Sequence, residues 1–264
     1  MTGHIKLKFF ITRRKIMPST KDLIPATQIR AAFIGYPGTG KTIAEASFID
    51  AGPMYIFDLD GRMAPIKKMF PDKDITYDTF NPYEYEKFHE KLNFFLDQIS
   101  SSSFPFKTVA IDSLTALARL STNYSKSFRK GKGLGKGPIQ ISEYEDYNTE
   151  ASAIAYMLSV LRSLPCHTIL TAHVIEAANA ANPLRLLTGG KAIAAETPSY
   201  FDEVYSFHAE QELTGEVLYK AYTIPRNGLP GKTALNLPKS FDHTNGSFYK
   251  LLKAHLEIEG IKLD

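Results

Sequence analysis

The stretch GYPGTGKT, residues 35–42, constrains the fold of this 264-residue chain more than any other. Three glycines and a proline within eight residues supply almost no side chain to a core, so the stretch is present for its backbone. AAFIG, residues 31–35, predicts a buried strand before it, and KTIAEASFIDAG predicts a helix that ends at Gly52. A strand, a glycine loop and a helix with the spacing G-x-x-x-x-G-K-[ST] form a phosphate-binding loop (P-loop).

The chemistry of this loop indicates its ligands. Backbone N–H groups surround phosphates at the positive end of a helix, Lys41 reaches the β- and γ-phosphates, and the hydroxyl of Thr42 holds Mg²⁺. We therefore expect ATP and Mg²⁺ as the ligands. The predicted nucleotide-binding residues are Gly35, Tyr36, Pro37, Gly38, Thr39, Gly40, Lys41 and Thr42.

Composition is that of an ordinary soluble globular protein, with 44% hydrophobic and 22% charged residues. The length allows one large domain or two small ones. No apolar run approaches the length of a membrane span and no signal peptide is evident, so we expect a cytoplasmic protein with no membrane partner. The single cysteine, Cys166, excludes an internal disulfide, and we expect it to be a small buried residue. A net charge of +3 is too mild to establish a nucleic-acid partner.

Acidic residues follow two apolar strands. One strand, within residues 54–63, ends in Asp58 and Asp60, and another, residues 108–111, ends in Asp112. An apolar strand that ends in aspartate supplies the carboxylate beside the Mg²⁺ of a P-loop, and we assign that role to Asp112. Asp58 or Asp60 polarises the attacking water as a general base; the alternative for either is a solvated loop acid.

The remaining pattern alternates helices and strands. A strand at 168–172 ends in His173, whose side chain is placed to touch the γ-phosphate. Helices are predicted at about 82–100 and 145–163, and FDEVYSFHAE and EVLYKAYTIP read as two further strands. This alternation predicts an α/β fold: a mostly parallel, twisted sheet with helices on both faces.

At this point the chain resembles the RecA-type recombinase ATPases. In particular it resembles the small phage-encoded RecA-like ATPases associated with single-strand annealing and recombination, over about residues 29–238. The motifs that carry the likeness are GYPGTGKT, which many NTPases share, VAIDSLTAL, TGGKA at 188–192 and PRNGLPG at 225–231. The resemblance implies a RecA-like P-loop NTPase core at 29–240. An N-terminal arm or extension, 1–28, precedes the core, and a C-terminal segment, 241–264, packs on it.

The resemblance also implies roles for single residues. Lys41 and Thr42 bind the phosphates and Mg²⁺, and Asp112 is the acid on the Mg²⁺ side. Asp60 stands where the family has its catalytic glutamate, and His173 where RecA has a glutamine that senses the γ-phosphate. An aspartate is one methylene shorter than a glutamate, so turnover is expected to be slow. A histidine adds pH dependence to the sensor.

A cation opposite Lys41 is missing from this set. The P-loop, Asp60 and Asp112 leave the charge that develops on the γ-phosphate without an arginine or lysine on its other side. In the resemblance, PRNGLPG faces the nucleotide of the next protomer, so Arg226 is the expected catalytic cation, supplied in trans within a ring or filament. Lys232 is the second choice and Lys191 the third. The alternative is that Arg226 only solvates a turn.

Two loops carry the prediction of single-stranded DNA binding. SKSFRKGKGLGKGPIQ, residues 125–140, combines five cations with glycines, and an aromatic side chain within it suits stacking on a base. EAANAANPLRLLTGGKA, residues 176–192, follows the His173 strand and has few acids. The alternative for the first loop is a solvated charged segment with no partner. The predicted DNA-binding residues are Lys126, Phe128, Arg129, Lys130, Lys132, Lys136, Arg185 and Lys191.

The sequence therefore predicts an ATP-dependent, single-stranded-DNA-binding RecA-like ATPase that acts in phage DNA recombination, repair or replication. We expect slow, DNA-stimulated hydrolysis in the cytoplasm of an infected bacterial host. Expected partners are DNA, further copies of the chain, and a single-strand-binding or annealing protein. Three alternatives remain: a hexameric helicase or translocase, an ATP-gated scaffold that does not hydrolyse ATP, and a small-molecule kinase, for which no acceptor pocket or lid is evident.

Overall fold

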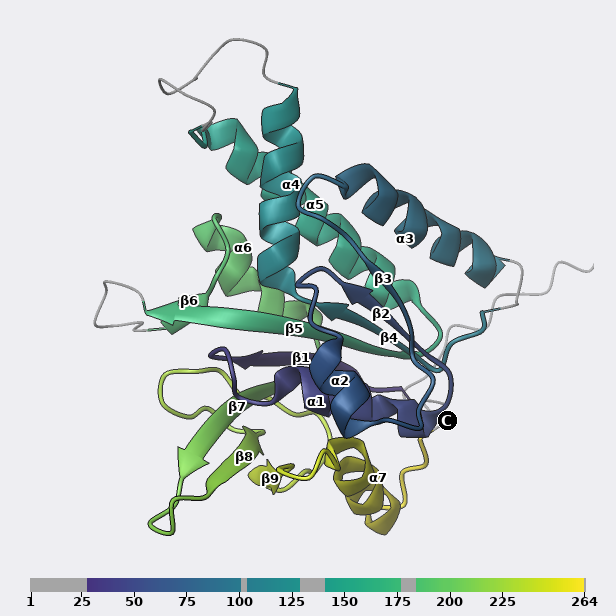
Figure 1. Cartoon of the computed structure of the whole chain (residues 1–264), viewed down its shortest axis with the longest axis vertical. Helices are drawn as coiled ribbons and strands as arrows, with labels where there is room; N and C mark the ends of the chain where they lie inside the picture. The colour runs from purple at the N-terminus through teal and green to yellow at the C-terminus, as the bar shows by residue number, and fades with distance from the viewer. Residues whose placement is uncertain (1–27, 101–103, 129–140, 177–183, 264) are drawn as a thin grey trace, which may run out of the picture.

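The computed structural model describes residues 28–100, 104–128, 141–176 and 184–263 (Figure 1). The strands are β1 (Arg30–Gly35), β2 (Met54–Asp58), β3 (Thr76–Thr79), β4 (Thr108–Asp112), β5 (His167–Glu176), β6 (Leu184–Leu186), β7 (Glu203–Gln211), β8 (Val217–Tyr222) and β9 (Ser240–Asp242). The helices are α1 (Lys41–Ala46), η2 (Ser47–Ala51), α2 (Ala64–Met69), α3 (Tyr85–Ser100), α4 (Leu114–Ser127), α5 (Tyr144–Ser163), α6 (Lys191–Glu196), η3 (Thr197–Tyr200) and α7 (Phe248–Ile258).

Within these ranges the strands form one sheet in the order β3-β2-β4-β5-β1-β7-β8-β9, with β6 paired to β5 outside this path. The five pairings from β3 to β7 are parallel, and β8 and β9 add antiparallel strands at one edge. The predicted mostly parallel α/β sheet is therefore confirmed. β5 lies between β1 and β4, so the strand before the P-loop and the strand before Ser113 each contact β5.

Alternation along the buried strands produces two cores. Successive side chains of a strand point to opposite faces, and in the central strands both faces are apolar. Ile34 and Phe57 pack in one core with α3, α4 and α5, whereas Phe33 and Ile56 pack in the other with α1, η2 and α7. Figure 1 shows these two helical layers on either side of the sheet, as the sequence predicts.

Two elements differ from the expected bounds. β5 does not end at His173, because β6 pairs with the next three residues and extends the strand as an antiparallel hairpin. His173 is instead the last residue of β5 that pairs with β1, opposite Gly35. The helix expected to end at Gly52 changes to a 3₁₀ helix at Ser47, whose hydroxyl donates to the carbonyl of Ala44 (2.6 Å).

The C-terminal residues complete the core that contains Phe33 and Ile56. β9 pairs with β8, and α7 buries Phe248, Leu252 and Leu256 against η2 and the sheet. The predicted arm, apart from residue 28, lies outside the described residues, and the predicted domain limits stay a prediction. Cys166 is buried as expected, and burial raises the pKa of its thiol to about 12. No helix in the described part of the chain is long and apolar enough to cross a bilayer.

Candidate functional site

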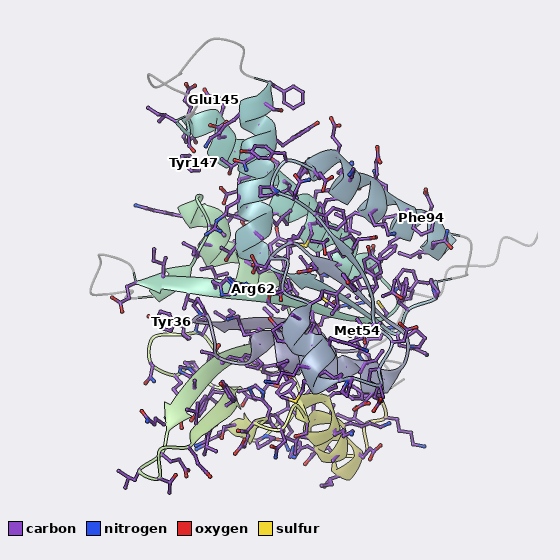
Figure 2. All side chains as sticks on the ribbon, viewed as in Figure 1. Tyr36, Met54, Arg62, Phe94, Glu145 and Tyr147 are labelled. Carbon is purple, nitrogen blue, oxygen red and sulfur yellow. The ribbon has the colours of Figure 1, made fainter. Side chains whose placement is uncertain are left out.

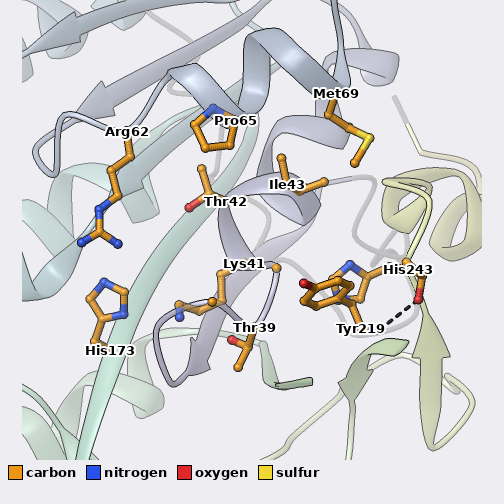
Figure 3. Close-up of a pocket in the computed structure, with 13 residues that line it drawn as sticks. Thr39, Lys41, Thr42, Ile43, Arg62, Pro65, Met69, His173, Tyr219 and His243 are labelled. Carbon is orange, nitrogen blue, oxygen red and sulfur yellow. Dashed lines mark hydrogen bonds between the residues drawn. The ribbon is translucent and has the colours of Figure 1, made fainter. Parts of the chain in front are cut away.

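The carboxyl ends of β1, β2, β4 and β5 meet at one edge of the sheet, which is where open α/β sheets bind ligands. A cavity of about 320 Å³ lies there (Figure 3), within the usual range for small-molecule sites. It is lined by Gly38, Thr39, Gly40, Lys41, Thr42, Ile43, Arg62, Pro65, Met69, His173, Tyr219, His243 and Thr244. We call the end lined by Lys41, Thr42, Arg62 and His173 the phosphate end. The far end is lined by Ile43, Met69, Tyr219, His243 and Thr244.

The P-loop is held by its own contacts. Gly40 has φ 86°, a left-handed conformation that glycine adopts most easily, and α1 begins at the next residue. Thr39 Oγ1 donates to the carbonyl of Tyr36 (2.8 Å). A Cβ on Gly35 would lie 2.5 Å from the carbonyl oxygen of Phe207, so β7 leaves room for nothing larger than glycine there. The backbone of the loop is thus preset for a ligand.

Lys41 points into this loop. Its Nζ donates to the carbonyls of Gly35 (2.9 Å) and Tyr36 (2.8 Å). Burial lowers the pKa of Lys41 to about 8, although the nearby charges of Asp112 and Asp60 oppose that shift. The ammonium is therefore poised to exchange two carbonyl oxygens for phosphate oxygens, a stronger charge-assisted pairing.

Thr42 and Asp112 supply adjacent oxygens. Thr42 Oγ1 donates to Asp112 Oδ2 (2.8 Å), and Thr171 Oγ1 donates to the other carboxylate oxygen. Burial raises the pKa of Asp112 in spite of these two hydrogen bonds. One carboxylate and one hydroxyl fit Mg²⁺, which takes few protein oxygens and completes its shell with phosphates and water. Among the described residues no cluster of three or more His, Cys, Asp or Glu side chains offers a self-sufficient metal site.

The structure separates the roles of Asp58 and Asp60. Asp58 is 2% exposed and its two carboxylate oxygens accept hydrogen bonds from the Arg62 N–H (2.9 Å) and Thr79 Oγ1 (3.1 Å). It therefore holds the turn after β2. Asp60 does not line the cavity itself, but its Oδ2 accepts from Ser113 Oγ (2.9 Å) and contacts Nε2 of His173, a lining residue, at 3.3 Å.

Asp60 stays ionised despite being half-buried. Burial works to raise its pKa, but the hydrogen bonds from His173 and Ser113 outweigh burial and hold the pKa below its usual value. The backbone N–H of Asp60 also donates to the carbonyl of Asp112 (3.2 Å), which ties the turn after β2 to the end of β4. Of the two acids, Asp60 is the one that contacts a residue lining the cavity.

His173 connects the phosphate end to the hairpin of β5 and β6. Its backbone N–H donates to Thr115 Oγ1 (3.3 Å) and its carbonyl accepts from Leu187 N–H (2.8 Å). The imidazole contacts Asp60 on the cavity side. The predicted sensor residue is thus brought to the site, although it lies within β5 and not at its end.

Arg62 is a cavity residue that the sequence analysis missed. Figure 3 shows its guanidinium pointing toward His173, across the phosphate end from Lys41. No arginine or lysine of the same chain was predicted opposite Lys41 from the sequence, and Arg62 is a cation of this chain that lines the same cavity. The available signal was position: Arg62 follows Asp60 by two residues, in the turn after a strand that ends at the site.

Three residues of the far end belong to no sequence motif and were not predicted from the sequence. Tyr219 comes from β8, and His243 and Thr244 follow β9. His243 is 1% exposed, burial lowers its pKa to about 4, and neither ring nitrogen has a hydrogen-bond partner in the described part of the chain. A Cβ on Gly40 would lie 2.8 Å from His243 Cε1, so the far end packs directly on the P-loop.

Arg226 does not line this cavity. Its guanidinium pairs with Glu210 (Nη2 to Oε1, 3.0 Å) and lies over the ring of Tyr222, with Cζ 4.1 Å from the ring centroid. Lys191 begins α6, and the backbone of Lys232 pairs with Val204; neither lines the cavity. A role for any of the three at a neighbour's nucleotide stays a prediction.

The predicted DNA-binding residues are only partly described. Lys126 lines a second cavity, of about 350 Å³, between α4, α5 and residues 187–189. Phe128 caps the end of α4 with 66% of its surface exposed. Arg185 lies on β6, where its backbone pairs with Ile175. The other predicted cations of the first loop, Arg129, Lys130, Lys132 and Lys136, lie outside the described residues.

Comparison with known proteins gives a family and little else. A family model described as an AAA domain matches residues 27–235, most of the chain. No curated protein matches the sequence. Among similar solved structures is the crystal structure of the uncharacterized protein PH0321 from Pyrococcus horikoshii in complex with an unknown peptide. It is 10% identical, the match covers 81% of this chain and 87% of that one, and the TM-score is 0.42.

Proposed function

This chain belongs to the AAA domain family of P-loop ATPases, and on that premise we propose that it hydrolyses ATP slowly in response to single-stranded DNA. The observation that supports hydrolysis is that Lys41, Thr42 and His173 line the phosphate end of one cavity, with Asp112 hydrogen-bonded to Thr42 and the ionised Asp60 in contact with His173. The nucleoside then occupies the far end, where Tyr219 offers an aromatic face.

The chain's own residues account for each part of the reaction. Lys41 exchanges its two loop carbonyls for phosphate oxygens, and Asp60 orients a water and accepts its proton as oxygen bonds to the γ-phosphorus. The electron pair of the broken bond leaves with ADP. Thr42 and Asp112 would hold Mg²⁺, which would supply positive charge to the phosphates. Because Asp60 is engaged by Ser113 and His173 and is shorter than glutamate, turnover is slow.

The DNA part of the proposal rests on the second cavity and its surroundings. Arg119 and Lys126 from α4 and Tyr147 from α5 all line it. Tyr147 is 38% exposed and Phe128 lies at the adjoining end of α4, so cations and aromatic rings occur together as single strands require. Figure 2 places Tyr147 at the start of α5, at the end of the molecule opposite α7. The basic stretch that follows Phe128 adds phosphate contacts in this proposal.

A hydrogen-bonded route joins the two cavities and supports coupling between them. The carbonyl of His173 accepts from Leu187, and two residues later the N–H groups of Gly189 and Gly190 donate to Glu150 Oε1 (2.8 and 3.2 Å). Glu150 Oε2 in turn accepts from Thr122 Oγ1 (3.2 Å) on α4. A change at His173 on γ-phosphate loss therefore reaches the residues that border the second cavity.

The finer role remains part of the proposal. We place the protein in recombination, repair or replication of a phage genome in the host cytoplasm, self-associated as a ring or filament and working with a single-strand-binding or annealing protein. Release of Arg226 from Glu210 at a subunit boundary would supply a cation in trans. Sustained unwinding of duplex DNA would instead favour the helicase alternative.

The deciding experiment measures ATP turnover alone, with single-stranded DNA and with duplex DNA, for the unchanged chain and for Lys41→Ala. We expect slow turnover that single strands stimulate. Changing Arg129, Lys130, Lys132 and Lys136 to alanine should lower the slope of log affinity against log salt, by about 0.7 for each lost phosphate contact. Turnover that single strands do not change, together with an unchanged salt slope, contradicts the DNA proposal and leaves the ATPase assignment intact.

A further inference from the structure

Arg62 presents an unpaired positive charge to the phosphate end. Its guanidinium lines the cavity and makes no hydrogen bond or ion pair with any residue that the structure describes. A guanidinium has five donors and normally pairs with a nearby carboxylate when one is free. Here the Oδ2 of Asp60, the acid two residues before Arg62, contacts Ser113 and His173, and neither acid of this turn pairs with the guanidinium. The donors of Arg62 are therefore left for a ligand.

The backbone of Arg62 is fixed even though its side chain is exposed. Its N–H donates to the buried carboxylate of Asp58 (2.9 Å), and Gly61 before it turns the chain with φ 68°. The N–H groups of Leu59 and Asp60 both donate to the carbonyl of Asp112 (2.7 and 3.2 Å). Because the turn is tied to β4, only the side chain of Arg62 has to adjust to reach a phosphate.

The charge of Arg62 already acts on Lys41 and Asp60. Burial is the main cause of the lowered pKa of Lys41, and the positive charge of Arg62 lowers it further. Arg62 also contributes to the lowered pKa of Asp60, after the hydrogen bonds from His173 and Ser113. Arg62 and Lys41 approach the phosphate end from different walls: Arg62 from the turn after β2, Lys41 from the P-loop (Figure 3).

We propose that Arg62 is a catalytic cation of ATP hydrolysis that each chain supplies to its own nucleotide. Its guanidinium contacts a γ-phosphate oxygen on the side opposite Lys41. As the water oxygen bonds to phosphorus, the bond from phosphorus to the bridging oxygen breaks. The electron pair departs on ADP, the proton passes to Asp60, and Arg62 stabilises the charge on the equatorial oxygens. This inference rests on the proposed ATPase function and adds a residue to it.

The first test compares Arg62→Ala and Arg62→Lys with Lys68→Ala, which removes an exposed cation of α2 that does not line the cavity. Turnover at saturating ATP and the affinities for ADP and for ADP with aluminium fluoride, a mimic of the transferring phosphoryl group, are measured. We expect Arg62→Ala to lower kcat by about 10² to 10³ and to weaken the aluminium fluoride complex by a similar factor, with ADP affinity within threefold of the unchanged chain. Arg62→Lys recovers part of both losses, and Lys68→Ala changes neither.

The second test mixes variants. Arg62→Ala mixed with Lys41→Ala should recover no turnover, because no chain then has both a working P-loop and Arg62. If Arg62 instead acted on a neighbour's nucleotide, the Lys41→Ala chain would supply Arg62 to the intact P-loop of the Arg62→Ala chain, and the mixture would recover turnover. Recovery there overturns supply by the same chain.

Other outcomes also decide the inference. Arg62→Ala that turns over ATP within threefold of the unchanged chain overturns it, and so does a loss of ADP affinity with kcat unchanged, since that is binding without catalysis. If the unchanged chain itself shows no turnover, the proposed function fails, and the role of Arg62 fails with it. If it turns over and Arg62→Ala matches it, only the role of Arg62 fails.

Discussion

The two ends of the cavity are built in opposite ways. The phosphate end and its surroundings gather Lys41 and Thr42 from the start of α1, Asp112 from the end of β4 and Asp60 from the turn after β2, all near the carboxyl ends of parallel strands. The far end is largely apolar, and part of it comes from β8 and from the residues after β9, more than 170 positions beyond the P-loop. The polar residues of the phosphate end stand at fixed spacings from the strands that carry them. The apolar residues of the far end can come from any element that packs against the P-loop.

The two largest expected effects are both at or beside the phosphate end. Lys41→Ala should weaken ATP binding by about 100-fold or more, because it removes a charge that pairs with phosphates in a buried setting. Stability should not fall, since burial already disfavours the charged lysine. Isothermal titration with ATP and a thermal melt check both expectations. Unchanged ATP turnover in this variant would end the P-loop interpretation.

A second prediction separates the two acids after β2. Asp60→Asn should bind ATP normally but lose about 10²- to 10⁴-fold in kcat, the usual contribution of a general base. Asp58→Asn should instead lower the melting temperature, because the buried Asp58 carboxylate holds the Arg62 N–H and Thr79. Single-turnover kinetics and calorimetry distinguish them. If both variants lose stability and neither loses kcat, the assignment of the base to Asp60 is wrong.

A third prediction addresses the far end. Tyr219→Ala should raise the dissociation constants of ATP and ADP by the same factor, roughly 5- to 10-fold for a lost aromatic contact, with kcat at saturation unchanged. Tyr219→Phe keeps the ring and serves as the matched control. A fall in kcat without a change in affinity would contradict a purely binding role for the far end, because Tyr219 would then affect the reacting atoms.

The smallest effect is expected behind the phosphate end, at Glu45. This carboxyl is fully buried, neither oxygen has a hydrogen-bond partner among the described residues, and burial, together with Asp112 and Asp58, raises its pKa well above the usual value. A raised carboxyl pKa favours the folded state at low pH, and that advantage is lost as pH rises above the unfolded value of 4.5.

Glu45→Gln should therefore raise the free energy of unfolding by about 1 kcal/mol or more at pH 8 and change it little below pH 4. Urea denaturation at the two pH values measures the difference. An equal change in the free energy of unfolding at the two pH values would contradict the raised pKa of Glu45 and would mean that another group pairs with its carboxylate.

The phosphate end was predictable because sequence position fixed it. Asp60, Asp112 and His173 each follow or end a strand that reads as apolar, and parallel strands bring such positions to one edge. The role of β5 was only half predicted, since its extension depends on pairing with β6, a strand of three residues with no pattern of its own. Arg62 was missed because the turn that aims it depends on the Asp58 side chain. Tyr219 and His243 were missed because only tertiary packing brings them to the P-loop.

The contact between Gly40 and His243 has a consequence for how this sequence can change over generations. A mutation at position 40 meets two separate obstacles, a left-handed backbone and an imidazole 2.8 Å from the position of a new Cβ. Shrinking His243 would remove the second obstacle and leave the first. Conversely, a bulkier residue in place of His243 presses on the loop that binds phosphate. The far end therefore cannot drift toward a different ligand shape without regard to the P-loop, and inherited changes at the two ends must arrive in compatible pairs.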